Sequence, residues 1–136
     1  MGKGKEMLNY TWVKGEPPKI ELNPLKWGEW FETAERTVEK TSISEGEVEM
    51  CEVSTVFLGI DHSFGSGTTK PVLFETAIFN STNSDVIQRY ETEKEAITGH
   101  AFIVERLISG FNAASIKKSL AEIKALEHEV KLLEEE

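Results

Sequence analysis

The clearest hydrophobic pattern lies between residues 52 and 79, where two runs rich in β-branched and aromatic residues flank a segment of Gly, Ser and Thr. This composition predicts two antiparallel strands and the turn that joins them. With the turn centred near Ser66, alternation places Val56 and Leu58 opposite Thr76 and Phe74 on one apolar face. We expect that face to lie on the core of the protein.

The other face of this predicted hairpin carries Phe57, Gly59 and Asp61 on the first strand and Glu75 on the second. A glycine inside a strand weakens the strand and often marks the close approach of another group. Two interpretations of Gly59 remain open, namely a β-bulge and a ligand cleft above the glycine.

An amphipathic helix is predicted after Asn23, which suits the N-cap, and Pro24, which suits the first helical position. One face of this helix is strongly aromatic, with the spacing i, i+3, i+4 and i+7, and consists of Trp27, Trp30, Phe31 and Ala34. We expect this face to cover the sheet, and the alternative is an aromatic platform for a ligand.

Shorter patterns predict the remaining elements. Strands are expected at residues 8–13, 36–43 and 86–90, and the second of these has the charged residues of an edge strand. The sequence Thr92-Glu93-Lys94-Glu95 is a capping box that opens a helix ending at Gly110.

A second helix pattern fills residues 113–136, with apolar residues at heptad positions and Ser119 as an interruption. The apolar heptad residues are Ile116, Ile123, Leu126, Val130 and Leu133. The pattern fits a terminal helix docked on its own domain and, equally, a helix that makes the protein a homo-oligomer. The sequence therefore predicts one α+β domain over residues 1–112, with a small antiparallel sheet of about four strands packed by helices, and a C-terminal helix over residues 113–136.

The composition of the chain indicates which kinds of partner and which cellular compartment to expect. The chain has 136 residues, 39% hydrophobic content and a formal net charge of −9, so we expect a single core and no direct nucleic-acid binding. Cys51 is the only cysteine, and no apolar run reaches the length of a membrane span. We expect a cytoplasmic protein with no membrane association and no cofactor.

Few residues suggest chemistry. Asp61 and His62 are adjacent at the end of a strand, and Glu75 with His100 could complete a metal-binding cluster. No metal-ligand spacing motif supports that cluster, and a single histidine among aliphatic helix residues is more often a hydrogen-bonded core residue. Arg89 and Tyr90 precede a helix and could hold an anionic group by charge and stacking.

Three segments of the chain resemble a group of small bacteriophage and prophage proteins. The segments are V-S-T-V-F-L-G-I-D-H at residues 53–62, L-F-E-T at 73–76, and R-Y-x-T-x-x-E-A-x-x-G-H at 89–100. The resemblance covers about the central half of the chain, and the group has no assigned activity. It implies a phage accessory protein that acts in the host cytoplasm, and it includes Asp61, His62, Glu75, Arg89, Tyr90 and His100 in its pattern.

From these observations we expect a non-enzymatic binding protein that a phage uses against its host. It would either sequester a small anionic, nucleotide-like signal or block a host protein. The expected ligand-binding residues are Phe57, Gly59, Asp61, His62, Glu75, Arg89, Tyr90 and His100. The alternatives are a metal-dependent phosphohydrolase or nuclease that uses Asp61, His62, Glu75 and His100, and a structural assembly protein.

Overall fold

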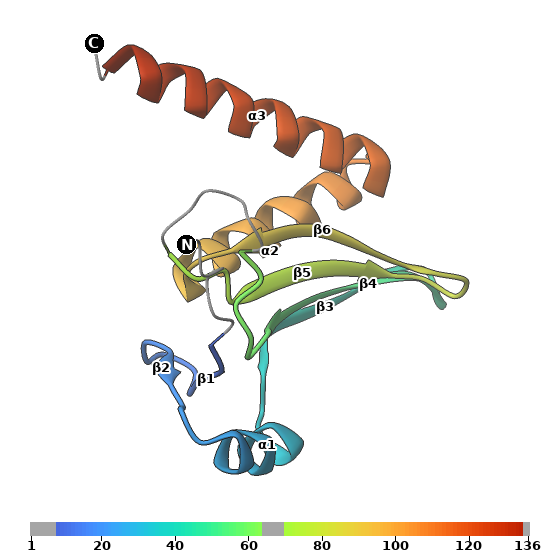
Figure 1. Ribbon diagram of the computed structural model, residues 1–136. Coiled ribbons are helices and arrows are strands. Elements are labelled where there is room, and N and C mark those ends of the chain that lie inside the picture. The colour runs from blue at the N-terminus through green and yellow to red at the C-terminus, as the bar shows by residue number, and fades with distance from the viewer. Residues whose placement is uncertain (1–7, 64–69, 135–136) are drawn as a thin grey trace.

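A computed structural model describes residues 8–63 and 70–134 of the chain. Its centre is a four-stranded antiparallel sheet in the order β3-β4-β5-β6 (Figure 1), formed by Thr37–Glu45, Val48–Phe57, Phe74–Phe79 and Ser84–Tyr90. A separate two-stranded sheet pairs β1 (Tyr10–Thr11) with β2 (Lys19–Ile20). With three helices beside these sheets, the predicted α+β class is confirmed.

The register of the central hairpin differs from the predicted register by one residue. β4 and β5 pair Thr55 with Thr76 and Phe57 with Phe74, so the core-facing residues of β4 are the odd-numbered ones. The prediction that Val56 and Leu58 share the core face with Phe74 was wrong. Because side chains alternate across a sheet, a slip of one residue moves a whole set of side chains to the opposite face.

Helix α2 (Glu93–Ile108) covers one face of the sheet and lies against all four strands. Its capping residue was predicted correctly, since the Thr92 hydroxyl accepts a hydrogen bond from the Glu95 amide at 3.1 Å. The helix buries Ala96, His100 and Ile103 against the sheet. Gly110 follows it with a φ of 98°, a backbone conformation in which glycine is favoured as a helix stop.

Helix α1 (Pro24–Thr33) begins as predicted, with the Asn23 side chain accepting hydrogen bonds from the first-turn amides. The expectation that it covers the sheet was wrong, because the helix lies beyond the end of the sheet and packs on β1 (Figure 1). The Trp27 indole donates a hydrogen bond to the Tyr10 carbonyl at 2.9 Å. Only Trp30 reaches the core, where its ring meets Phe57 edge-on at 5.9 Å.

Helix α3 (Ala113–Glu134) is longer than the part of the domain on which it packs. It contacts β6 and α2, and Ile116 in its first turn is buried with Val53, Ile78 and Ile103. The rest of the helix extends along the top of the molecule in Figure 1 and ends at the C-terminus. No helix in residues 8–63 and 70–134 is both long enough and apolar enough to cross a membrane.

Candidate functional site

A hydrogen-bonded network of polar side chains crosses the sheet beneath α2. His100 from α2 places Nε2 at 2.8 Å from the Thr41 hydroxyl of β3 and Nδ1 at 2.7 Å from the Thr55 hydroxyl of β4. Thr55 bonds in turn to Thr76 of β5, whose hydroxyl lies 2.9 Å from the Tyr90 hydroxyl of β6. This network therefore links every strand of the four-stranded sheet to α2.

Burial determines the protonation states of His100 and Tyr90 in this network. His100 is 1% exposed, and desolvation lowers its pKa because the charged imidazolium loses its hydration. Burial also raises the pKa of Tyr90 to about 12. Both groups are therefore neutral at physiological pH, and their hydrogen bonds hold the helix in place on the sheet.

Gly99 leaves the space in which Tyr90 packs against α2. A Cβ atom at position 99 would overlap the Tyr90 hydroxyl and ring, so only glycine lets the tyrosine lie against the helix. Apart from Arg89, the residues of the R-Y-x-T-x-x-E-A-x-x-G-H segment thus have structural roles. Thr92 and Glu95 cap the helix, Ala96 is buried, Gly99 allows a close approach, and Tyr90 and His100 are hydrogen-bonded in the core.

Asp61 is a buried carboxylate that organises the chain after β4. It accepts hydrogen bonds from the Ser63 amide at 2.9 Å, the Ser63 hydroxyl at 3.0 Å and the Val72 amide at 2.9 Å. These bonds join the two ends of the connection between β4 and β5. The predicted site residue Asp61 is therefore engaged in a structural role.

The space above Gly59 is filled. Gly59 has a φ of 84°, and a Cβ atom there would lie 3.1 Å from both Trp27 and Phe31 of α1. The glycine thus marks the close approach of the aromatic helix, and the predicted ligand cleft at this position was wrong. Phe57 is fully buried and stacks on Trp12 with ring centroids 5.5 Å apart.

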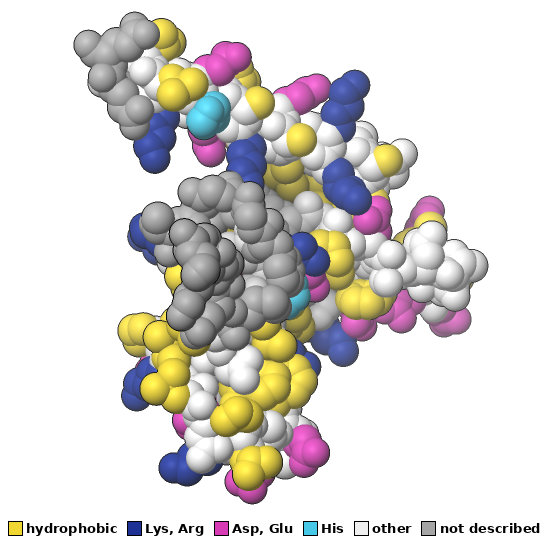
Figure 2. Space-filling view, in the orientation of Figure 1, with side chains coloured by type: hydrophobic (Ala, Val, Ile, Leu, Met, Phe, Trp, Pro, Cys, Tyr) yellow, Lys and Arg dark blue, Asp and Glu magenta, His cyan; other side chains and the backbone are white. Residues whose placement is uncertain are grey.

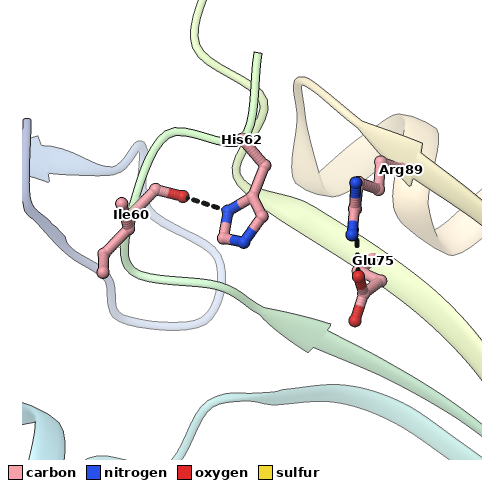
Figure 3. A network of polar contacts seen from close by, with 4 residues as sticks. All are labelled: Ile60, His62, Glu75 and Arg89. Atoms are coloured by element: carbon pink, nitrogen blue, oxygen red, sulfur yellow. Dashed lines mark hydrogen bonds and ion pairs between the residues drawn. The ribbon is translucent and has the colours of Figure 1, made fainter. Parts of the chain in front are cut away.

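Three of the predicted polar residues lie near one another away from α2 (Figure 3). Arg89 Nε donates to Glu75 Oε1 at 3.0 Å across neighbouring strands, on the face of the sheet that α2 leaves open. The His62 ring is turned toward the Ile60 carbonyl, to which its Nδ1 donates at 2.7 Å (Figure 3). His62 and Arg89 also line a groove in the described part of the chain.

This groove, which we call the β6–α3 groove, has a volume of about 760 Å³. β6 forms one wall and the middle of α3 forms the other. The charged residues among its lining are Arg89, Lys117, Lys124, Glu91, Glu95 and Glu127, so basic and acidic side chains are equal in number. Apolar side chains such as Val86, Leu120 and Ile123 lie between them.

Gln88 adds a polar feature to the same groove. Its side-chain oxygen Oε1 is buried and, within the described residues, has no hydrogen-bond partner. A buried acceptor without a donor destabilises the fold. The sequence analysis missed Gln88 and the α3 wall, because no local pattern indicates which strand edge a distant helix approaches.

The four residues of the metal-hydrolase alternative do not converge. His100 projects from α2 onto the face of the sheet that this helix covers, whereas Glu75 lies on the opposite face. Asp61 accepts hydrogen bonds from backbone amides. Within residues 8–63 and 70–134, no group of three or more His, Cys, Asp or Glu side chains is placed to hold a metal ion. A site of that composition is not supported by the geometry.

Comparison of the chain with family models, with curated proteins and with solved structures finds no match in any of the three.

Proposed function

We propose that this chain is a non-enzymatic binding protein that captures an extended segment of another protein in the β6–α3 groove. The observation that carries the proposal is the outer edge of β6, the last strand in the sheet order, which pairs with no further strand among the described residues and forms one wall of the groove. An edge strand presents backbone donors and acceptors to which an incoming strand can add. The resemblance to phage and prophage proteins supports a bacterial host protein as the partner.

The lining of the groove favours a polypeptide over a nucleotide. A nucleotide carries several negative charges, whereas the basic and acidic side chains in this groove balance each other and Arg89 is already paired with Glu75. Alternating apolar and charged lining is typical of a protein interface.

A small anionic ligand is the second candidate. It is favoured by the presence of both His62 and Arg89 in the lining of the groove. Such a ligand would have to displace Glu75 from Arg89, whose side chain is 43% exposed and therefore open to competition from solvent and ligand. A thermal-shift screen with cyclic and linear nucleotides separates the two candidates, since ligand at 100 times its dissociation constant stabilises a fold by about 2.7 kcal/mol.

The protein-binding proposal is tested with peptides selected by the purified chain from a displayed random library. Ala121 of α3 lines the groove and is exposed, so Ala121→Trp fills the groove without altering the core. Ala125→Trp is the matched control, because Ala125 is equally exposed on the same helix but does not line the groove. We expect Ala121→Trp to weaken binding of the selected peptides about tenfold or more, equivalent to about 1.4 kcal/mol, and Ala125→Trp to leave it unchanged.

Hydrogen exchange supplies the second readout. A peptide added along the edge of the sheet should slow exchange of the outward-pointing amides of β6. Equal binding by the wild type and by Ala121→Trp would contradict the proposal. Stabilisation by a nucleotide, lost in Arg89→Ala, would replace it with the small-ligand function.

A further inference from the structure

The second half of α3 packs on no other element within residues 8–63 and 70–134. Ile116 is 2% exposed and Leu120 is partly buried, but every residue from 121 to 134 is exposed. In Figure 1 this half extends past the sheet toward the C-terminus. Short helices that pack on nothing are only marginally stable in water, so this half relies on the docked first turns.

This unpartnered half has an apolar stripe. Ile123, Leu126, Val130 and Leu133 continue the heptad spacing that begins at Ile116, and their exposed fractions run from 43% to 70%. Figure 2 shows hydrophobic side chains distributed along α3, with charged side chains between them. A regular stripe of large apolar residues is the surface that a second amphipathic helix covers.

The residues that flank the stripe have one sign of charge. In this heptad register Ile123 and Val130 occupy the a positions, and Leu126 and Leu133 occupy the d positions. The flanking e and g positions on the described helix are then occupied by four glutamates, Glu122, Glu127, Glu129 and Glu134. The lysines Lys124 and Lys131 fall at b, outside the flanks. In a coiled coil the e and g residues face the partner and decide which partner is accepted.

These charges disfavour the self-association that the sequence pattern alone allowed. A parallel pair of α3 helices would bring Glu122 against Glu127 and Glu129 against Glu134 of the second copy. An antiparallel pair would bring e against e and g against g, which is again Glu against Glu. Like charges at these positions are repulsive in both orientations.

We propose that the second half of α3 binds a cationic amphipathic helix, with Lys or Arg flanking an apolar stripe, supplied by another protein. The partner's apolar residues cover Ile123, Leu126, Val130 and Leu133, and its basic residues pair with the four flanking glutamates. Ile123 and Glu127 also line the β6–α3 groove, so the two surfaces adjoin each other along α3. The inference rests on the exposure and the charges of α3 alone and does not depend on the proposed function.

Two synthetic peptides of one apolar sequence test the proposal on the full chain. The first carries Lys at every e and g position and the second carries Glu at the same positions. Titration calorimetry at neutral pH and low salt is expected to show binding of the Lys peptide and at least about tenfold weaker binding of the Glu peptide. Added salt is expected to weaken the Lys peptide, since exposed charge pairs are screened.

Variants of α3 assign the binding to the stripe and its flanks. Leu126→Gln should abolish binding of the Lys peptide, whereas Leu132→Gln should not, because Leu132 is 51% exposed but lies off the stripe. The combined change Glu122→Lys, Glu127→Lys, Glu129→Lys and Glu134→Lys should invert the preference between the peptides. All four positions are exposed, so the fold is not at risk.

Three results would overturn the proposal. They are equal binding of the two peptides, binding of neither peptide, and a dimer of the wild-type chain at neutral pH that Leu126→Gln dissociates. The last result would identify a second copy of the chain as the occupant of the stripe.

Discussion

Helices α2 and α3 follow each other in the chain and differ in how they use their apolar faces. α2 buries residues along its length, at Ala96, His100 and Ile103, and anchors itself with a polar network that reaches all four strands. α3 is longer but buries only Ile116. The fold is therefore completed by α2 and the first turns of α3, whereas residues 121–134 of α3 are exposed.

The comparison is tested most strongly within α3 itself. Ile116→Ala removes a side chain that is 2% exposed and packs on Val53 and Ile103, so we expect a loss of about 3 kcal/mol in the free energy of unfolding. Leu126→Ala, at a position 60% exposed, should change it by less than about 0.5 kcal/mol. Urea denaturation of the two variants measures both values, and equal losses would show that the second half of α3 is packed.

Substitution of a glycine in α2 tests how closely this helix approaches the sheet, and substitution of a glycine in α1 serves as the control. Gly99→Ala would push a methyl group into the Tyr90 ring, so we expect a loss of about 2 kcal/mol after the gain in helix propensity is included. Gly28→Ala in α1 meets nothing within 4 Å and should stabilise the protein by up to about 1 kcal/mol. Thermal denaturation separates the two, and a stabilising Gly99→Ala would contradict the packing of Tyr90.

The polar network under α2 predicts a smaller, pH-dependent effect. Tyr90→Phe removes the hydroxyl that bonds to Thr76 and should cost about 1 kcal/mol at neutral pH. In the unfolded chain the tyrosine ionises near its ordinary pKa of about 10, whereas in the fold the pKa is raised to about 12. The unfolded state therefore loses its proton first, and the stabilising effect of the neutral tyrosine declines as the pH rises between these two values.

Denaturation of the wild type and Tyr90→Phe at about pH 9 and about pH 11 checks this prediction. The wild type should lose more stability than the variant over this interval, because only the wild type carries the buried phenol. The same loss in both proteins would mean that Tyr90 is accessible to solvent in the fold.

The sequence predicted the fold class and the local ends of the helices well. Caps depend on short-range hydrogen bonds, so Asn23, Thr92 and Gly110 could be assigned from their neighbours alone. The positions of β3 and β6 were also close to the predicted ranges.

The register of the central hairpin could not be predicted, because both faces of β4 are largely apolar and the connection after Phe57 is not a symmetric turn. Thr55 and Thr76 have polar side chains on the core face, where hydrogen bonds to each other and to the network offset the cost of burial. Alternation of hydrophobicity placed Thr76 on the core face correctly but assigned Thr55 to the opposite face.

The candidate site was predicted only in part. Periodicity gives the aromatic face of α1 but not its contact surface, so the occupation of the space above Gly59 by Trp27 and Phe31 was hidden. His62 and Arg89 remain at the groove, but the opposite wall comes from α3, which is remote in sequence. Tertiary placement of remote elements is the information that the local patterns lack.

Hydrogen exchange along α2 and α3 of the full chain tests the central claim most directly, with and without the Lys-flanked peptide. We predict slow exchange in α2 and the first turns of α3, fast exchange beyond residue 121, and slowing of that second half when the peptide is added. Slow exchange throughout α3 in the monomeric chain without peptide would contradict the claim that this half has no partner within its own fold.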